Sequence, residues 1–395
     1  MFTRYRYIFI LIISSLALYS CSDDPGSIGS NYDELIPTAE ISSDSLAQSG
    51  SNDTTIINTE SSSRLLLGKY KNVESSILVK FGISSSTVAD SILTQFKKDS
   101  ITINSARVEM TAVYRLGSSS ANLNYSVHKI NNSWTITGFN VKSLPDISYS
   151  GEISNNHYTQ NDTLYGFYMD ASVAKDWLTS VSDTTHKNYG LYLRPQGSAD
   201  LMVGFQGINT YATRPFLKLV LNITKPGKYS GKEVSFVASE DIHVVKGQQY
   251  EPAGSGNITL QGGLAQHSTL KFDLSKVPSK VMIVYAGLEL NVDSLHSDFG
   301  TPNMSDSIAV RMRKTTKSDK GYDSNYVYVL SRSGGKFTGD VTYYVQRWIN
   351  GETNDGFILS LYNERNCADI LTLFGSNYAD KSRRPRLKII YATNK

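Results

Sequence analysis

The chain has 395 residues, with 39 Lys or Arg against 36 Asp or Glu, so its formal net charge is only +3. This balance argues against a nucleic-acid-binding protein, which would usually present a basic face. The length exceeds what one hydrophobic core usually serves, and it predicts two domains.

Residues 1–20 have the pattern of a secretory signal peptide. Arg4 and Arg6 precede an apolar run, 7–19, that is too short to span a bilayer comfortably. The sequence Leu18-Tyr19-Ser20-Cys21 resembles a bacterial lipobox, with Leu three positions before the Cys and a small residue directly before it. The resemblance implies cleavage before Cys21, which would then be acylated as the mature N-terminus. The alternative is an ordinary signal peptide with an incidental Cys.

The residues after Cys21 concern the location of the protein. Ser22-Asp23-Asp24 forms an acidic run that is similar to the surface-export tags of some Gram-negative lipoproteins. We therefore predict a protein held in the outer membrane by a lipid anchor, not by a spanning segment. The predicted location is the cell surface, with the periplasmic face as the alternative. Without Arg4 and Arg6 the mature chain keeps 37 basic residues against 36 acidic ones, so its charge is balanced.

Residues 21–63 are rich in Ser, Asn, Asp and Thr, and they include Pro25, Pro37 and few large apolar side chains. This composition predicts a polar tether that holds the folded part of the chain off the membrane. The segment 54–57, Thr-Thr-Ile-Ile, is a candidate for a strand at the end of the tether.

Two series of short strands follow the tether, each alternating or apolar and bounded by turn residues. The first series is 65–70, 76–83, 103–110 and 125–128, and the second, in the same order, is 258–263, 268–274, 283–290 and 308–311. Each series ends in a degenerate copy of one cassette, and Arg384 of the later copy lies 170 residues after Arg214 of the earlier one. The sequence thus predicts one topology made twice.

The cassette begins with a short amphipathic helix. In the later copy Val341, Val345, Trp348 and Ile349 form one stripe at helical spacing, and Asp340 is placed to cap the first amides. In the earlier copy the stripe is Val173, Ala174, Trp177 and Leu178, after Asp170. Two strands follow each helix, and the second begins at an Arg-Pro pair. Proline has no backbone N–H to donate, and the first position of a strand is where the loss of that hydrogen bond matters least. We interpret Trp177 and Trp348 as core residues.

The predicted fold class is all-β, with two tandem jelly-roll-like β-sandwiches that each carry one short lid helix. The first sandwich is expected over 64–222 and the second over 231–393. Lys225-Pro226-Gly227-Lys228 is the expected hinge. Each copy holds its own opening strands, helix and closing strand, so we expect two independent folding units without exchange of strands.

Several motifs of the second series resemble a known family. Lys-Phe-Asp-Leu at 271–274, Ala-x-Leu-x-Leu at 286–290, Val-Thr-x-x-Val-x-x-Trp at 341–348, Gly-Phe-Ile-Leu at 356–359 and Arg-Pro-x-Leu at 384–387 occur in this order in DNRLRE-type domains. These are jelly-roll modules of secreted bacterial proteins, similar to certain carbohydrate-binding modules. The first series keeps the order but lacks the Val-Thr pair. The N-terminal part, Cys21-Ser22-Asp23-Asp24 with Ile28-Gly29 and 65–70, resembles a family of Gram-negative surface lipoproteins.

Catalytic motifs give no positive signal. The six His residues are scattered, and no His-x-x-x-His, Cys-x-x-Cys, Gly-x-Ser-x-Gly or phosphate loop occurs. We therefore predict no enzyme activity, no cofactor and no metal site. Glu109 and Glu289 occupy equivalent strand positions, and we interpret both as solvent-facing. The alternative is that they form a catalytic pair of general acid and general base.

Two further features have a functional and a structural interpretation. Asp293, Asp298 and Asp306, with Asn291 and Asn303, are calcium-type ligands in one long loop, but an ordinary polar loop is the favoured interpretation. Cys367 is the second of only two cysteines, so acylation of Cys21 leaves no disulfide partner. We interpret Cys367 as a buried small residue and not as a nucleophile.

The aromatic content is the positive indication of binding, since the chain has 25 Tyr and 3 Trp. Trp134 follows a polar loop and has no counterpart in the second series, and Tyr211, Tyr322 and Tyr326 lie in similar polar settings. Exposed aromatic rings are what stacking on sugars requires. These four residues are the candidate ligand contacts, while tyrosine enrichment typical of β-proteins is the alternative.

Two functions of different class follow. The first is a non-catalytic surface lipoprotein that binds glycan or another surface polymer, or serves adhesion or assembly, with a polysaccharide or surface protein as its partner. The alternative is a polysaccharide-active hydrolase or lyase with an unrecognised acidic pair. Two carboxyl groups that converge in one groove would favour the alternative.

Overall fold

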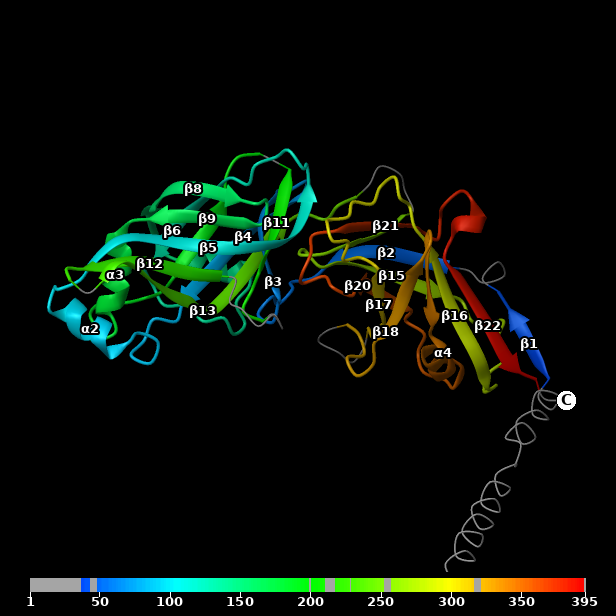
Figure 1. Cartoon of the computed structure of the whole chain (residues 1–395). Coiled ribbons are helices and arrows are strands. Elements are labelled where there is room, and N and C mark those ends of the chain that lie inside the picture. Colours follow the sequence, from blue (N-terminus) through cyan, green and yellow to red (C-terminus); the bar gives the residue numbers. More distant parts are fainter. Residues whose placement is uncertain are drawn as a thin grey trace, which may run out of the picture.

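The computed structural model describes residues 37–42, 48–198, 200–209, 217–227, 229–251, 257–315 and 321–393. The predicted signal peptide, Cys21 and Tyr211 lie outside these residues. Strands make up 49% of the structure and helices 10%, and two large antiparallel sheets form a sandwich-like arrangement. The predicted all-β sandwich class is confirmed. The strands form two halves that lie end to end in an elongated molecule (Figure 1).

The N-terminal half is the 11-stranded sheet system built from β3–β13. Its strands are β3 (Arg64–Tyr70), β4 (Val73–Phe81), β5 (Thr102–Gly117), β6 (Tyr125–Ile130), β7 (Tyr149–Glu152), β8 (Ser154–Gln160), β9 (Leu164–Met169), β10 (Leu191–Pro195), β11 (Leu201–Gln206), β12 (Leu217–Lys225) and β13 (Tyr229–Gly247). The strand order is β13-β12-β5-β11-β3-β4-β10-β6-β7, with β9 on β5 and β8 on β9.

The C-terminal half is the second 11-stranded system and contains β1, β2 and β14–β22. Its strands are β1 (Thr38–Ile41), β2 (Gln48–Thr54), β14 (Asn257–Gln261), β15 (Gln266–Phe272), β16 (Ile283–Asn291), β17 (Ser307–Met312), β18 (Tyr328–Ser333), β19 (Lys336–Asp340), β20 (Phe357–Leu361), β21 (Ile370–Phe374) and β22 (Arg386–Ala392). The order is β1-β22-β16-β19-β18-β17-β20-β15-β14-β21, with β2 on β15.

The strand pairing repeats between the two halves, as the cassette predicts. Strand β10 pairs with β4 and β6, and its counterpart β20 pairs with β15 and β17. Strand β12 pairs with β5 as β22 pairs with β16, and β11 pairs with β3 as β21 pairs with β14. The Arg214-Pro215 pair of the earlier copy lies outside the described residues.

The predicted domain boundaries differ from the strand pairing, because the leading strands of the two repeats are exchanged. Strands β1 and β2 lead the first repeat, yet they pair with β22 and β15 of the C-terminal half. Strand β13 leads the second repeat, yet it pairs with β12 and β4 of the N-terminal half. Each half is therefore completed by a strand that precedes the other half in the sequence.

This exchange corrects three predictions. The prediction of a tether through residue 63 is wrong for 38–41 and 48–54, which are strands. The start of the second sandwich at 231 is wrong because β13 belongs to the N-terminal half. The expected hinge lies in the β12–β13 hairpin: Lys225 ends β12 and pairs with Tyr229, and 226–227 are turn residues. Lys228 lies outside the described residues.

Both predicted helices form, and the buried face of the first is as predicted. The prediction is wrong for Val341, which is the buried N-cap residue before the second helix and not part of its stripe. Helix α3 (Ala171–Thr179) buries Val173, Ala174, Trp177 and Leu178, and α4 (Thr342–Ile349) buries Tyr344, Val345, Trp348 and Ile349. Oδ1 of Asp170 accepts from the Ser172 amide at 2.9 Å, and Oδ1 of Asp340 accepts from the Thr342 amide at 2.7 Å. The N-terminal half also has α2 (Asp90–Lys97), which is an addition to the predicted single helix.

The two halves share one apolar core at their junction, contrary to the expectation of independent folding units. A single buried cluster contains Leu66, Tyr114 and Met202 of the N-terminal half together with Leu260 and Leu371 of the C-terminal half. Paired backbone hydrogen bonds of 3.0 and 2.7 Å also join Arg115 to Thr301 across the junction. The junction therefore has the apolar packing of a protein interior and joins the halves into one body.

A hydrogen-bond network around Asp369 lies in this junction. The Tyr114 hydroxyl donates to Oδ1 of Asp369 at 2.6 Å and accepts from the Ala368 amide at 3.1 Å. The Gly300 amide donates to the same Asp369 oxygen, and Ser305 Oγ donates to Oδ2 at 2.9 Å. Because the carboxylate is fully buried, these donors replace the water it loses on folding.

Candidate functional site

The candidate aromatic residues do not converge on one site. Trp134 lies in the N-terminal half, whereas Tyr322 and Tyr326 lie in the connection between β17 and β18 of the C-terminal half. Trp134 is half-buried and not exposed: its Nε1 donates to the Tyr189 carbonyl at 2.8 Å, and its ring contacts Phe139 edge-on. Tyr322 lies beneath the Arg311 guanidinium, 5.2 Å from the ring centroid.

Tyr326 forms an exposed aromatic surface together with two tyrosines that sequence reasoning did not single out. We call Tyr326, Tyr328 and Tyr343 the tyrosine platform. The Tyr343 ring centroid lies 4.8 Å from that of Tyr326 and 6.3 Å from that of Tyr328. Tyr326 is 45% exposed and Tyr343 38%, so part of their ring surface stays open to solvent.

The buried Tyr344 holds the platform in place. Its hydroxyl donates to the Tyr326 carbonyl at 2.8 Å, and its ring meets Tyr328 at 4.9 Å in an edge-on arrangement. Burial raises the pKa of Tyr344 to about 12, so its hydroxyl stays a donor at physiological pH. The loop carrying Tyr326 and the strand carrying Tyr328 are thus fixed to α4, which carries Tyr343 and Tyr344.

An ion-pair cluster borders the platform. The Arg347 guanidinium lies 5.5 Å from the Tyr343 ring centroid, and it donates to Asp323 Oδ2 and Glu352 Oε1, both at 2.8 Å. Lys314 Nζ lies 3.4 Å from each of the same two carboxylates. The hydrogen bond from Arg347 lowers the pKa of the Asp323 carboxyl. Fixed polar groups therefore border the aromatic rings, an arrangement suited to hydroxyl-rich ligands.

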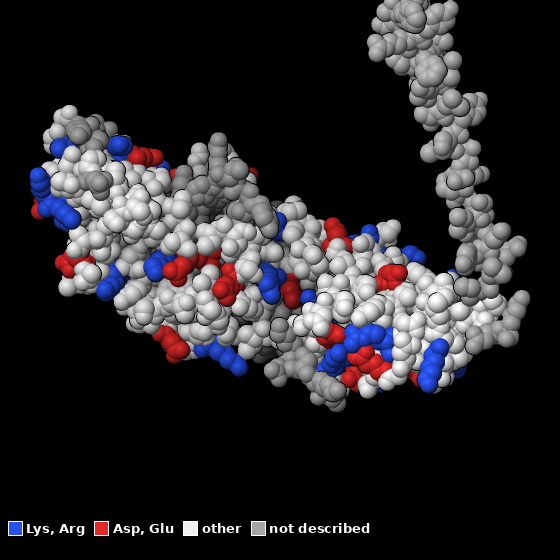
Figure 2. Space-filling model, turned by 90° about the horizontal axis from the view of Figure 1, so that it is seen from below, with Lys and Arg blue, Asp and Glu red and all other residues white. Residues whose placement is uncertain are grey.

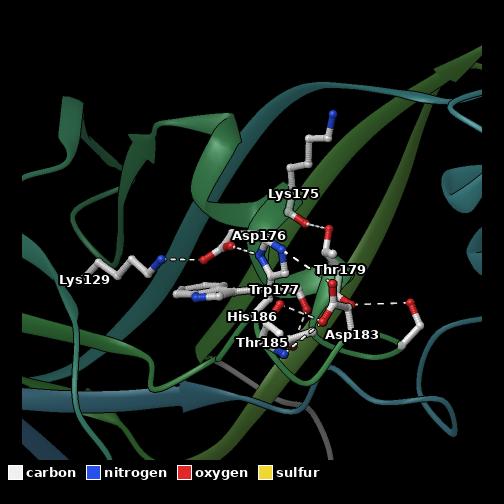
Figure 3. Close-up of polar contacts among 10 residues, drawn as sticks. Lys129, Lys175, Asp176, Trp177, Thr179, Asp183, Thr185 and His186 are labelled. Atoms are coloured by element: carbon white, nitrogen blue, oxygen red, sulfur yellow. Dashed lines mark hydrogen bonds and ion pairs between the residues drawn. The ribbon is translucent and has the colours of Figure 1, made fainter.

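The corresponding position in the N-terminal half carries the opposite charge. Asp176 precedes Trp177 as Arg347 precedes Trp348, and it forms an ion pair with Lys129 at 2.5 Å and a contact with His186 Nδ1. Burial acts to raise the pKa of Asp176, but hydrogen bonds from Lys129 and His186 outweigh it and lower that pKa. Figure 3 shows these side chains around Trp177, with Asp183 beside His186. Ser172 stands where the C-terminal half has Tyr343, so the platform is specific to the C-terminal half.

A groove of about 850 Å³ opens beside Trp348 in the C-terminal half, lined by Gln48, Lys271, Asp273, Leu274 and Asn354 among others. The connection over this region, 273–282, is half as long as its counterpart 82–101, which carries α2. In the N-terminal half, Ile92 and Leu93 of α2 belong to the same apolar cluster as Trp177. The Trp177 side chain is fully buried there. The shorter connection thus explains why the groove lies beside Trp348.

The structure places the two acidic residues of the sequence analysis in different halves, Glu109 on β5 and Glu289 on β16, each beside a cationic side chain. Glu109 accepts from Arg107 Nε at 2.8 Å, and Glu289 accepts from Lys336 Nζ at 2.9 Å. Glu109 is 9% exposed, so the prediction of a solvent-facing position is wrong for it. The pair is also not equivalent by strand register, because Glu109 lies opposite Lys218 while Gly287 lies opposite Lys388, the counterpart of Lys218.

The acidic loop distributes its side chains among separate protein partners. Asp293 Oδ2 lies 2.7 Å from His296 Nδ1, Asp298 forms an ion pair with Lys71, and Asp306 accepts from Asn303 at 3.2 Å. Asn291 donates to the Arg383 carbonyl at 3.2 Å. Among the residues that the structure describes, no group of three or more His, Cys, Asp or Glu is arranged to hold a metal ion.

Cys367 is fully buried in the shared core, as predicted for a small structural residue. Burial raises the pKa of the Cys367 thiol well above its usual range, which disfavours the thiolate that a nucleophile needs. The groups around it include Asp369, which raises that pKa further. The environment is therefore that of a packing residue.

The surface charge is mixed. On the face that Figure 2 shows, Lys and Arg lie interspersed with Asp and Glu over both halves. This distribution follows from the near-equal numbers of basic and acidic residues. Over the described part of the chain, no helix has the length and apolar character needed to cross a membrane.

Signals for the platform were present in the sequence but were not connected. Tyr343 lies on the polar side of the predicted helix stripe, where an aromatic residue is unusual, and Tyr326 and Tyr328 are two residues apart.

We compared the chain with protein-family models, with curated protein sequences and with solved structures. No family model, curated protein or solved structure matches it.

Proposed function

We propose that the chain is a lipid-anchored, non-catalytic protein of the outer-membrane surface that binds glycan through the tyrosine platform. The observation that carries the proposal is the exposed ring surface of Tyr326 and Tyr343 next to the Arg347 cluster. Aromatic rings stack on the apolar faces of sugar rings, while fixed charged and amide groups exchange hydrogen bonds with the hydroxyls. The motifs of 271–387 resemble DNRLRE-type domains, which are similar to certain carbohydrate-binding modules, and this resemblance agrees with a glycan ligand.

The rigidity of the platform adds to this support. A ligand that stacks on preformed rings does not have to order them, so less free energy is lost on binding. Tyr344 fixes Tyr326, and the ion pairs of Arg347 fix the edge of the platform. Catalysis is not part of the proposal because Glu109 and Glu289 each take a cationic partner within their own half.

The binding test first applies the protein to a glycan array. The polysaccharides that bind it on the array are then tested by affinity electrophoresis. Tyr326→Ala and Tyr343→Ala should each weaken binding about tenfold or more, because one stacked ring is lost. Tyr362→Ala is the matched control, since Tyr362 is 55% exposed on the same half but lies outside the platform. Binding that persists unchanged in the Tyr326→Ala/Tyr343→Ala variant would contradict the platform. Release of reducing sugar from a bound polysaccharide would favour the hydrolase alternative.

The anchor is tested separately. Metabolic labelling with a fatty-acid analogue should mark the wild-type protein and not Cys21→Ser, because the variant lacks the thiol that would be acylated. Two acyl chains give stable membrane attachment, whereas one chain gives marginal attachment. Protease accessibility on intact cells then distinguishes the cell surface from the periplasmic face. Equal labelling of both proteins would refute the lipid anchor without affecting the glycan proposal.

A further inference from the structure

Three exposed apolar side chains lie at the start of β16, which we call the apolar tip: Met282, Val284 and Tyr285. They are 53%, 48% and 40% exposed. Three such residues within four positions form an apolar patch and not an isolated exposed side chain. Patches of this kind on a soluble body mark contacts with another protein or with a membrane.

The apolar tip lies where the chain arrives from its N-terminal segment. The Ala392 amide donates to the Met282 carbonyl at 2.9 Å, and the next amide, of Thr393, donates to the Pro37 carbonyl at 2.7 Å. Pro37 precedes β1, which pairs with β22 beside β16. Figure 1 shows β1 and β22 at one end of the molecule and α2 at the other.

The N-terminal half provides an internal comparison. Its counterpart of β16 is β5, in which Arg107 stands at the register position of Tyr285, because Val220 lies opposite Arg107 as Ile390 lies opposite Tyr285. The residues before Arg107 include Asn104 and Ser105 and no run of exposed apolar side chains. Asn104 Nδ2 donates to Asn222 Oδ1 at 3.0 Å, so this tip is polar and hydrogen-bonded. The same fold therefore does not require an apolar tip, and in the C-terminal half this one lies at the end where the chain enters.

Further along β16 and its neighbours the same surface becomes charged. Lys388 forms an ion pair with Glu40 at 3.0 Å, and Lys336 forms one with Glu289. Lys280, two residues before Met282, is exposed. An apolar end followed by charged residues matches the gradient from acyl chains through headgroups to water at a membrane surface.

We infer that the apolar tip docks on the membrane surface and holds the elongated body with its C-terminal half next to the lipid and its N-terminal half outward. This inference rests on the proposed acylation of Cys21. Sixteen residues lead from Cys21 to Pro37 and span at most about 55 Å. An anchor at that distance keeps the tip at high effective concentration near the bilayer, so three apolar side chains suffice for docking.

The test places fluorescent labels at the two ends of the acylated full-length protein in vesicles that contain a paramagnetic lipid. Thr38→Cys and Thr94→Cys replace exposed threonines on β1 and α2. Cys367 is fully buried and Cys21 is acylated, so neither should take the label. We expect severalfold stronger quenching of the label at position 38 than of the label at position 94.

The decisive variant is Met282→Thr/Val284→Asn/Tyr285→Ser, which introduces the polar residue types found at the start of β5. Quenching at position 38 should fall severalfold while vesicle attachment and the thermal melt stay unchanged. Leu295→Ser is the control, since Leu295 is 90% exposed outside the tip and its loss should leave quenching unaltered. Equal quenching before and after the triple substitution would overturn the docking. Fatty-acid labelling of the same samples distinguishes two failures. Labelled protein with unchanged quenching refutes the docking alone, whereas unlabelled protein refutes the lipid anchor and with it the docking.

Discussion

The hydroxyl of Tyr114 in the N-terminal half donates to the carboxylate of Asp369 in the C-terminal half at 2.6 Å, and both side chains are buried. Tyr114 also contributes its ring to the apolar cluster that the two halves share. A hydrogen bond to a buried charge is stronger than one between neutral groups, and removal of its donor leaves the charge under-solvated. This contact therefore makes the stability of either half depend on the other.

The first prediction is that Tyr114→Phe destabilises the whole chain by about 1–3 kcal/mol. The ring and its packing remain, so the loss reports the hydrogen bonds to Asp369 and from the Ala368 amide. Urea denaturation should show one shifted transition that includes both halves. Tyr362→Phe, at an exposed position, is the control. An unshifted midpoint, or a shift confined to one of two separate transitions, would argue against a shared core.

The second prediction concerns the two helix tryptophans. Trp177→Ala and Trp348→Ala should each cost roughly 3–5 kcal/mol, because each ring fills the core beneath its helix. Trp348 also lines the groove of the C-terminal half, so chemical denaturation and glycan binding should be measured on the same samples. Unchanged stability together with lost binding of Trp348→Ala would overturn its assignment as a core residue.

The third prediction concerns pH. His243 on β13 is fully buried, and burial outweighs a backbone contact with Arg64 and lowers its pKa from 6.5 to about 3. The unfolded chain therefore binds a proton below pH 6.5 that the folded chain does not bind. His243 should cost stability progressively as the pH falls from 6.5 towards 3, by at most about 1.4 kcal/mol per pH unit.

The measurement compares wild type with His243→Leu in urea between pH 7 and pH 4. The advantage of the Leu variant should grow as the pH falls. Burial also raises the pKa of Asp241 to about 6, which has the opposite sign: that contribution is present below pH 3.8 and is lost as the pH rises through 6. Both proteins keep Asp241, so their difference isolates His243. A difference that does not change with pH would contradict the buried neutral histidine.

The repeated elements were predictable because their signals are local. The stripe of Val345, Trp348 and Ile349 determines which side of α4 is buried, and Asp340, one residue before the N-cap Val341, accepts from the Thr342 amide within the same short segment. Strand alternation likewise requires only neighbouring residues. These features recur in both halves, so the second copy supports the interpretation of the first.

The exchange of leading strands could not be predicted in the same way. Strand β2 has the sequence Gln-Ser-Gly-Ser-Asn-Asp-Thr, whose polar composition resembles a tether, and it is fixed mainly by backbone pairing with β15. The two halves have the same topology, so each offers an equivalent edge to a leading strand. Which edge is taken depends on contacts more than 200 residues apart, such as Ser51 with Thr269.

The tyrosine platform illustrates the same limit for the site. Tyr326 was a candidate because of its polar surroundings, but Tyr343 lies on a helix and becomes its neighbour only in the folded chain. Trp134 had the stronger signal by sequence, yet the Tyr189 carbonyl and Phe139 occupy its polar and apolar surfaces. Composition indicated aromatic binding, whereas tertiary contacts decide which rings stay exposed.

The central structural claim is that β1 and β2 complete the C-terminal half although they precede the N-terminal half in sequence. The most direct test is the chain 55–395, which lacks both strands, with a synthetic peptide of residues 37–54 added in trans. We expect this chain to melt earlier than the full chain, to bind the peptide, and to regain the stability of the full chain, while a scrambled peptide has no effect. A chain 55–395 that melts like the full-length protein and does not bind the peptide would contradict the exchange.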